Sequence, residues 1–366
     1  MSVSFLDLSA AYTEVSAELE AAAQRAMRSG WYIGGPEVTA FESAFAKFCD
    51  AKDAIGVANG LEAIEIALHA FEIGAGDEVI VPANTFIATW LAVARRGAVI
   101  VPVEPDLETY NITPEAVAEA ITPRTRAVIP VHLYGQPADI DGIMRVASER
   151  DLIVIEDAAQ CHGGRCHGAR IGSVGHAATW SFYPSKNLGA LGDGGAITTN
   201  HAEAAARMRL LSNYGSSQKY IHDLPGTNSR LDPLQAAMLS VKLPLLDEWN
   251  RRRQAVAAEY LDALSETGLV LPKIADWAEP VWHLFVVRHP YRDDLMTALR
   301  ERGVETLIHY PIPPHRQNAF KDLGFGEGAF PITEQMSQEC FSLPMGPHLS
   351  TDDTQRVIAT LKELLA

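Results

Sequence analysis

The sequence predicts an α/β protein with a mainly parallel sheet flanked by helices and a smaller C-terminal α/β domain. Short apolar runs rich in β-branched residues alternate with longer segments whose apolar residues recur at helical spacing. Parallel strands need a crossover connection, usually a helix, so repeated alternation of this kind builds a parallel sheet covered by helices on both faces. A long helical pattern then leads into a second, shorter set of strands and helices.

The predicted strands of the first part are evenly spaced, and a helical pattern follows each of the first five. These five runs are Ala54–Val57, Val79–Val81, Val99–Val103, Ala127–Val131 and Ile153–Ile155. Two further apolar runs, Ala177–Phe182 and Ala196–Thr199, flank a short turn that holds one lysine. Continuous apolar runs of this length are typical of strands buried on both faces.

The helical pattern from Asp232 to Ala263, interrupted near Pro244, joins two predicted domains, residues 1–245 and 246–366. The second domain is expected to contain strands at Trp282–Val287 and Glu305–His309 and helices at Asp293–Arg302 and Thr351–Leu365. We expect this smaller domain to close over the large one.

The composition is that of an ordinary globular protein, with 47% hydrophobic and 21% charged residues. The 30 basic and 46 acidic residues give a net charge of −16. Such a charge argues against nucleic acid or an anionic membrane as the main partner, because phosphate-rich surfaces would repel the protein. No apolar run approaches the length of a membrane span and no signal peptide is recognised, so a cytoplasmic location is expected.

The segment Ser181–Gly195 (SFYPSKNLGALGDGG) places Lys186 in the turn between the last two strand-like runs. Aromatic and small residues flank this lysine, and a glycine-rich loop follows it. A lysine in such surroundings is partly desolvated, so its amine can lose a proton and attack a carbonyl carbon. The alternative is a structural turn with an incidental lysine, which the surrounding residues must decide.

A candidate carboxylate closes the apolar run Leu152–Asp157 (LIVIED). Ligands of open α/β sheets sit beyond the carboxyl ends of the strands, which places Asp157 at a ligand site. Glu156 points to the opposite face of the strand. The alternative role for Asp157 is to cap the following helix.

A candidate anion site lies at Asn59-Gly60, between an apolar strand and an apolar-periodic helix. The first amides of a helix and its dipole attract anions, so the backbone amides of Gly60 and Leu61 are candidates, helped by the hydroxyl of Ser181. Without further context, Asn-Gly before a helix is an ordinary turn.

Lys186 in its glycine-rich turn, together with Asp157 and the helix start at Gly60, resembles pyridoxal-phosphate (PLP) enzymes of the aspartate-aminotransferase fold (fold type I). More narrowly, it is similar to the DegT-type nucleotide-sugar aminotransferases. The resemblance implies that Lys186 binds the PLP aldehyde covalently and carries protons, while Asp157 pairs with the pyridine nitrogen.

The same resemblance implies further contacts to PLP. Gly60 and Leu61, the latter standing where many relatives have a hydroxyl residue, would bind the phosphate with Ser181. Phe86, after the strand Val79–Val81, would stack on the ring. Gln160, three residues after Asp157, would reach the phenolic oxygen.

A shared active site is also implied. The segment Gly226–Ala237 (GTNSRLDPLQAA) resembles the one with which a family subunit reaches into its partner's site, so Asn228 would touch the partner's cofactor phosphate. Lys219 and Tyr220, just upstream, become candidates for the partner's nucleotide or sugar, and a homodimer is expected. The alternative for this segment is a loop that ends in a helix cap, with Asp232 capping and Pro233 first in the helix.

The segment Leu307–His315 (LIHYPIPPH) most closely resembles the branch that aminates C-3 of a dTDP-linked 3-keto-6-deoxyhexose. His309, Tyr310 and Tyr183 are the candidate sugar contacts, and glutamate is the expected amino donor. Two alternatives stay open: a C-4 aminotransferase acting on a nucleotide-linked 4-keto sugar, and a non-catalytic PLP-binding regulator. Sugar dehydratases of this fold lack the lysine, so Lys186 argues against that branch.

The cluster Cys161–His167 (CHGGRCH) contains soft and imidazole ligands, but its spacing matches no usual zinc pattern. We therefore expect no metal, and we expect His162 to lie near the cofactor. Four cysteines in 366 residues do not predict a disulfide scaffold.

Overall fold

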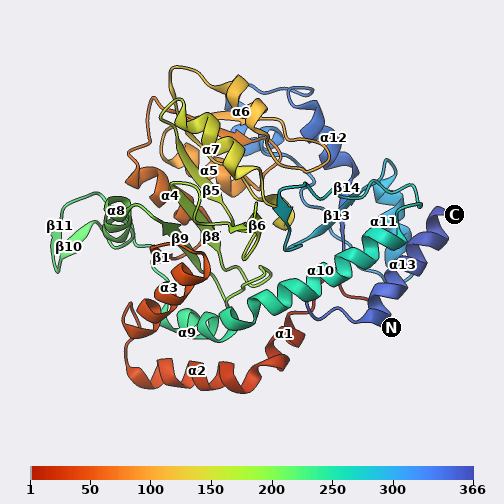
Figure 1. The fold of residues 1–366 in the computed structure, drawn as a ribbon, viewed down its shortest axis with the longest axis horizontal. Coiled ribbons are helices and arrows are strands. Elements are labelled where there is room, and N and C mark those ends of the chain that lie inside the picture. Colours follow the sequence, from red (N-terminus) through yellow and green to blue (C-terminus); the bar gives the residue numbers. More distant parts are fainter. Residues whose placement is uncertain (1) are drawn as a thin grey trace.

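The computed structural model describes residues 2–366 and contains the predicted α/β architecture (Figure 1). Its centre is a seven-stranded sheet with the order β1-β9-β8-β5-β4-β2-β3. The strands, in chain order, are β1 (Asp53–Val57), β2 (Glu78–Pro82), β3 (Val99–Val103), β4 (Thr125–Val128), β5 (Ile153–Asp157), β8 (Ala177–Ser181) and β9 (Gly195–Thr199). Only β9 runs antiparallel to its two neighbours; all other pairs in this sheet are parallel.

Helices cover both faces of this sheet, as the alternation of strands and helices predicts, but the helix expected after Ile153–Ile155 is wrong, since β5 leads into turns and short strands. One face packs on α4 (Gly60–Ala70), α5 (Ile87–Arg95) and α8 (Ala202–Ser212). The other face packs on α3 (Pro36–Phe48), α6 (Pro114–Ala120), α7 (Ile140–Ser148) and α9 (Pro233–Lys242). Within β2, Ile80 enters the second core while Val79 and Val81 enter the first, which is why the strand reads as a continuous apolar run.

The predicted interruption at Pro244 is present. Helix α9 ends at Lys242, a 3₁₀ turn spans Leu243–Leu245 (η2), and α10 (Leu246–Ala263) then crosses to the far end of the molecule (Figure 1). The proline ring clashes with the preceding turn of a regular helix, so the helix is broken there. Two N-terminal helices, α1 (Leu8–Glu14) and α2 (Ser16–Ser29), lie along this edge, and α2 packs on α9.

The C-terminal part has its own core, built on a two-stranded antiparallel sheet of β13 (Phe285–Arg288) and β14 (Cys340–Leu343). Its helices are α11 (Arg292–Glu301), α12 (Pro331–Glu339) and α13 (Thr351–Leu365), with 3₁₀ turns η3 (Pro314–Arg316) and η4 (Asn318–Leu323). Val3 joins this core from the other end of the chain. The boundary between residues 1–245 and 246–366 stays a prediction.

The expected strand at Glu305–His309 is wrong. In that segment only Leu307 forms a β-bridge, with Ser342 of β14, and the preceding Val304 pairs with Val3. An extended segment needs a neighbour along its whole length to become a strand, and these two partners each cover a single residue. The strand expected at Trp282–Val287 instead starts at Phe285, because Trp282 has a left-handed backbone (φ 49°).

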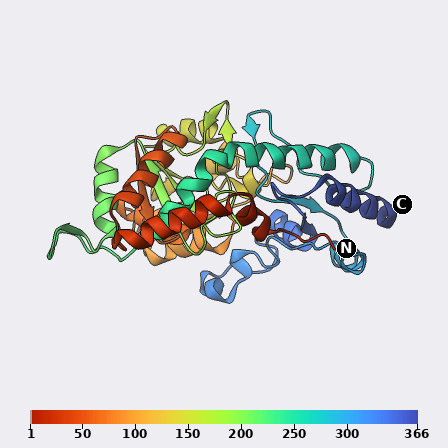
Figure 2. The ribbon, with the colours of Figure 1, turned by 90° about the horizontal axis from the view of Figure 1, so that it is seen from below.

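Smaller elements complete the chain. The hairpin β10 (Ser216–Gln218) and β11 (Ile221–His222) projects from the body next to α8 (Figures 1 and 2). A three-stranded sheet consists of β6 (Arg165–Cys166), β7 (Ala169–Arg170) and β12 (Ala278–Glu279), and η1 covers Leu133–Gly135. Among residues 2–366, no helix has both the length and the apolar character that crossing a membrane requires.

Candidate active site

A cavity of about 500 Å³ opens at the carboxyl end of β5, between the large sheet and the C-terminal part. Ten of the thirteen residues that the sequence predicted for the site line it. They are Gly60, Leu61, Phe86, Asp157, Gln160, Ser181, Tyr183, Lys186, His309 and Tyr310. The strands that carry Asp157 and Ser181 are parallel neighbours, so both strands end at the same edge of the sheet. This brings the two residues to one side of the cavity.

Lys186 lies in the turn between β8 and β9, where its backbone amide donates to the Tyr183 carbonyl at 2.8 Å. Gly189 keeps this turn tight, since a Cβ there would lie 2.3 Å from the Pro184 carbonyl oxygen. Lys186 lines the cavity together with Asp157. Burial lowers the pKa of Lys186 to about 8, although the charge of Asp157 acts in the opposite direction. A substantial share of the amine is therefore neutral near physiological pH.

This pKa predicts how the protein captures an aldehyde. The neutral amine is the nucleophile, so the rate of covalent PLP capture by cofactor-free protein should rise with pH and level off above about 8. An unperturbed lysine would keep accelerating to about pH 10.4. Stopped-flow absorbance of PLP mixed with the protein measures this profile, with Lys186→Ala as the blank. A rate still climbing steeply beyond pH 9.5 would contradict the assigned pKa.

Asp157 ends β5 with its side chain buried and hydrogen-bonded. The Thr89 hydroxyl donates to Oδ2 at 2.8 Å, and the Ala159 amide donates to Oδ1 at 3.3 Å. Burial raises the pKa of Asp157, while these two hydrogen bonds and the charge of Lys186 act to lower it. A protonated nitrogen brought against this carboxylate would compensate for the burial of its charge, so the site favours a cationic N–H group.

The anion end of the cavity is the start of α4. The Asn59 side chain caps the helix by accepting from the Glu62 amide at 2.9 Å. The amides of Gly60 and Leu61, first in the helix, have no intrahelical acceptor and are available to a phosphate. Gly60 packs closely on β8, since a Cβ there would lie 2.9 Å from the Ser181 Cβ. The glycine thus lets the helix start approach the Ser181 hydroxyl.

Aromatic rings and Gln160 bound the cavity on the side of the C-terminal part. The ring of Phe86, half of it exposed (50%), lies 5.2 Å from that of Tyr310. The Gln160 amide nitrogen donates to the Tyr310 hydroxyl at 2.8 Å, and its oxygen accepts from the Tyr134 amide at 2.6 Å. One amide N–H of Gln160 stays available, as contact with a phenolic oxygen requires.

Two residues of the site were missed by the sequence interpretation. Thr89 contacts Asp157 from α5, and His283 lines the cavity with its Nδ1 lacking a hydrogen-bond partner. Burial, with the charges of Lys186 and Arg253, lowers the pKa of His283 well below its usual value. Neither residue belongs to a local motif, so the sequence offers no signal beyond their polarity in apolar surroundings.

Lys219, Tyr220 and Asn228 do not line the cavity of their own chain. Lys219 and Tyr220 lie between β10 and β11, at the tip of the hairpin that projects from the body (Figure 2). Tyr220 is 83% exposed, and the Lys219 ammonium lies 5.2 Å from its ring. Asn228 is exposed and forms a β-bridge with Asn213.

His162 and the cysteine cluster also lie outside the cavity. His162 is fully buried against Trp180 and Phe182, and burial lowers its pKa to about 3. Within residues 2–366, one group of possible metal ligands has its donor atoms within 4.8 Å of one another, namely Asp139, Cys166 and His167. Asp139 already caps α7 through the Gly142 amide at 2.9 Å. The expectation that the protein holds no metal stays a prediction.

These observations test whether PLP fits. The cavity offers an amine with a lowered pKa, a buried carboxylate, free helix amides beside Ser181, and an exposed aromatic face, which are the four groups that this cofactor requires. Lys186, Asp157, Gly60, Leu61 and Phe86 would hold it. The fit supports the cofactor predicted from the sequence.

Comparison with known proteins agrees with this site. Residues 13–362 match the DegT/DnrJ/EryC1/StrS aminotransferase family. The chain is 52% identical to the erythromycin biosynthesis sensory transduction protein EryC1 of Saccharopolyspora erythraea, over 99% of each chain. It is 51% identical to the dTDP-3-amino-3,4,6-trideoxy-alpha-D-glucose transaminase of Streptomyces venezuelae, over 99% of this chain and 96% of that protein.

Solved structures extend the agreement to the fold. The structure of DesV from S. venezuelae, in complex with a ketimine intermediate, matches with a TM-score of 0.98 at 50% identity and covers 100% of this chain and 98% of that one. NtdA of Bacillus subtilis, at 32% identity and a TM-score of 0.92 over 100% of this chain and 85% of that one, contains bound PMP. The predicted fold and family are thus confirmed. The chain belongs to the DegT/DnrJ/EryC1/StrS aminotransferase family.

Proposed function

We propose that this enzyme is a PLP-dependent aminotransferase that moves an amino group from an amino acid, with glutamate as the expected donor, to C-3 of a dTDP-linked 3-keto-deoxyhexose. The observation that carries the proposal is that the Lys186 amine and the Asp157 carboxylate face one cavity beside a free helix start. The full-length relationship to a dTDP-3-amino-sugar transaminase supports the choice of substrate.

Bound PLP supplies an electron sink for the bond that breaks at the substrate carbon. The protein supplies the rest. Lys186, with a pKa near 8, can accept a proton from the substrate carbon and return it, which is general base and acid catalysis. Asp157, held by Thr89, would stabilise the positive charge of a protonated ring nitrogen. His283, His309 and Tyr310 line the cavity and take up space that water would otherwise fill.

The sugar contacts are proposed to come from Tyr183, His309 and Tyr310. Tyr183 is 56% exposed next to the lysine, which leaves its hydroxyl available to a substrate. The His309 Nδ1 is paired with the Ser342 hydroxyl at 2.8 Å, and burial lowers the pKa of this histidine to about 4. A neutral imidazole can exchange hydrogen bonds with sugar hydroxyls without placing a second positive charge near Lys186.

The substrate assay uses purified protein, PLP and glutamate with a matched pair of 3-keto and 4-keto nucleotide sugars, and detects the amino sugar by mass. We expect product from the 3-keto sugar. Turnover confined to the 4-keto sugar would show that the position of amination is wrong, while leaving the aminotransferase reaction in place.

A non-catalytic regulator is the second candidate, because EryC1 carries the name of a sensory transduction protein. Such a protein could keep the cofactor without using it. The Lys186 and Asp157 pair argues against it, since binding alone does not need a proton carrier beside the reacting carbon. Adding glutamate to the PLP-loaded protein separates the two: loss of the yellow absorbance indicates transamination, whereas an unchanged spectrum supports a regulator.

We further propose a homodimer in which the hairpin of one subunit and its Asn228 complete the partner's site. The support is that Lys219, Tyr220 and Asn228 are exposed and outside their own cavity, although the resemblance assigns them to substrate and phosphate. An exposed tyrosine beside a lysine at the tip of a projecting hairpin is suited to contact an anionic nucleotide on another subunit.

Mixing two inactive variants tests this arrangement. In a mixed dimer of Asn228→Ala and Lys186→Ala chains, one of the two sites retains both residues, so equal mixing should restore roughly a quarter of the wild-type rate. The measurement is turnover after subunit exchange, with the fraction of mixed dimers determined by differential tagging. No recovery despite abundant mixed dimers would place Asn228 outside the partner's site.

A further inference from the structure

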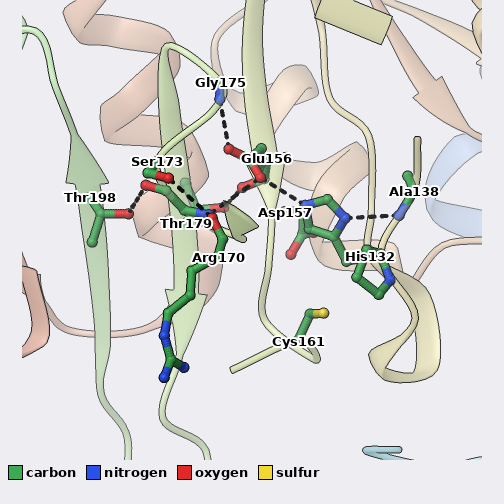
Figure 3. Close-up of polar contacts among 12 residues, drawn as sticks. His132, Ala138, Glu156, Asp157, Cys161, Arg170, Ser173, Gly175, Thr179 and Thr198 are labelled. Carbon is green, nitrogen blue, oxygen red and sulfur yellow. Dashed lines mark hydrogen bonds and ion pairs between the residues drawn. The ribbon is translucent and has the colours of Figure 1, made fainter. Parts of the chain in front are cut away.

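A buried carboxylate–imidazole pair lies on the face of β5 opposite Asp157. The side chains of Glu156 and His132 are both 0% exposed, and His132 Nε2 lies 3.0 Å from Glu156 Oε2 (Figure 3). The Gly175 amide donates to Glu156 Oε1 at 2.8 Å, and the Gly172 amide donates to Oε2 at 3.4 Å. The carboxylate thus accepts from three donors, which compensates for removing its charge from water.

The hydrogen bonds fix the tautomer of His132. The Ala138 amide donates to Nδ1 at 3.0 Å, so Nδ1 carries a lone pair and the ring proton is on Nε2 (Figure 3). Nε2–H then donates to Glu156. Because both ring nitrogens are engaged in a site without solvent, the ring has one orientation, and the backbone of His132 is held with it.

The backbone held in this way contacts the cofactor-facing residues. The His132 amide donates to the Asp157 carbonyl at 3.0 Å, and the Asp157 amide donates to the Pro130 carbonyl at 2.8 Å. Two residues later, the Tyr134 amide donates to the Gln160 side chain at 2.6 Å. The loop that follows β4 therefore carries main-chain contacts to both Asp157 and Gln160.

We propose that His132 and Glu156 are a positioning pair that fixes this loop, and through it sets Asp157 and Gln160 against the cofactor. Neither residue lines the cavity. Their role depends on the proposed PLP function. It goes beyond that function by assigning a task to two buried polar groups on the far face of the strand.

Replacing Glu156 with glutamine should disrupt the pair by chemistry, with little change in shape. The carboxylate has two acceptor oxygens, facing Gly175 on one side and His132 on the other. An amide has one oxygen and one NH₂ group, so either orientation sets a donor against a donor. The His132 ring cannot relieve the conflict by changing tautomer without losing the Ala138 contact.

The test compares Glu156→Gln, His132→Asn and His132→Gln. Asparagine places its polar group near the position of Nδ1 and cannot reach Glu156, whereas glutamine can still donate to it. We expect Glu156→Gln and His132→Asn to bind PLP about 10-fold more weakly and to have a kcat about 10-fold lower, with the KM for the sugar unchanged. His132→Gln should recover most of the PLP affinity and most of the kcat. PLP titration of cofactor-free protein and steady-state kinetics give these values.

A matched control is Thr198→Val. Thr198 lies fully buried on the same face, accepts from Trp180 Nε1 at 3.0 Å and donates to the Gly172 carbonyl at 3.0 Å, but it has no contact with the loop after β4. It should lower Tm while leaving PLP affinity and kcat close to wild type. If Glu156→Gln and His132→Asn merely lower Tm as this control does, or if His132→Asn equals His132→Gln, the pair is structural only and the proposal is overturned.

Two further outcomes are informative. If Glu156→Gln does not fold, the comparison of His132→Asn with His132→Gln decides alone. If the wild-type protein binds no PLP, both the proposed function and the role of the pair are disproved. If the wild-type protein binds PLP and the variants match its PLP affinity and kcat, only the positioning role is disproved.

Discussion

Replacing Lys186 with alanine should abolish turnover, with kcat/KM lower by at least about 10⁴-fold. The amine is the one group in the cavity that combines a pKa near 8 with a position facing Asp157, and no other lysine lines the cavity within residues 2–366. Its loss removes both the covalent attachment of PLP and the proton carrier. Mass spectrometry after borohydride reduction measures the first effect, and the substrate assay measures the second.

Lys47→Ala is a suitable control, since Lys47 is exposed in the last turn of α3 and does not line the cavity. It should retain full turnover and one reducible PLP per chain. Lys186→Ala protein that still turned over at more than a few per cent of the wild-type rate would disprove the assigned mechanism.

Replacing Asp157 with asparagine should keep most of the PLP affinity but lower kcat by about 10²–10³-fold. Asparagine preserves the shape and can still pair with the Thr89 hydroxyl, but it carries no charge to stabilise a protonated ring nitrogen. The electron-withdrawing capacity of the cofactor then falls during the chemical step, when it is needed most. Single-turnover absorbance changes with glutamate measure this step directly.

Thr89→Val separates charge from orientation at this position. It leaves the Asp157 carboxylate but removes the hydrogen bond at 2.8 Å, so we expect a smaller loss of about 10-fold in the same step. An Asp157→Asn rate within threefold of the wild type would show that Asp157 does not stabilise the ring nitrogen. Equal losses in both variants would assign the effect to orientation alone.

Local sequence patterns were enough to predict most of the large sheet and to single out Lys186 and Asp157. Four of the five predicted strand–helix units are present, and Pro244 interrupts the long helix as expected. The helix expected after the fifth strand is wrong, because β5 is followed by the short strands β6 and β7. Asp157 could be placed at a ligand site from sequence because ligands sit beyond the carboxyl ends of parallel strands, and the family resemblance joined Lys186 to it. The structure shows the reason, since β5 and β8 are neighbours. The cavity-lining positions of Phe86, His309 and Tyr310 were predicted by resemblance.

Local patterns failed where an outcome depends on a distant partner. The segment Glu305–His309 has the composition of a strand, but only Leu307 has a neighbour in β14. His162 has the chemistry of a site residue, yet Trp180 and Phe182 enclose it in the core. In both cases the residue's own properties were read correctly, and the packing around it determined the result.

The sequence by itself determined the alternation of strands and helices, the reactive lysine and the carboxylate at a strand end, because these follow from periodicity and from the rule that parallel strands end at one edge. The tertiary structure alone decided which groups support them. Thr89 is 68 residues from Asp157, and Tyr310 is 150 residues from Gln160. His132 and Glu156 meet only because β4 lies beside β5. Hydrogen bonds between residues so far apart in the chain produce no periodic pattern in the sequence, so they could not be predicted from it. Their geometry forms only when the sheet and the cores on both its faces have packed.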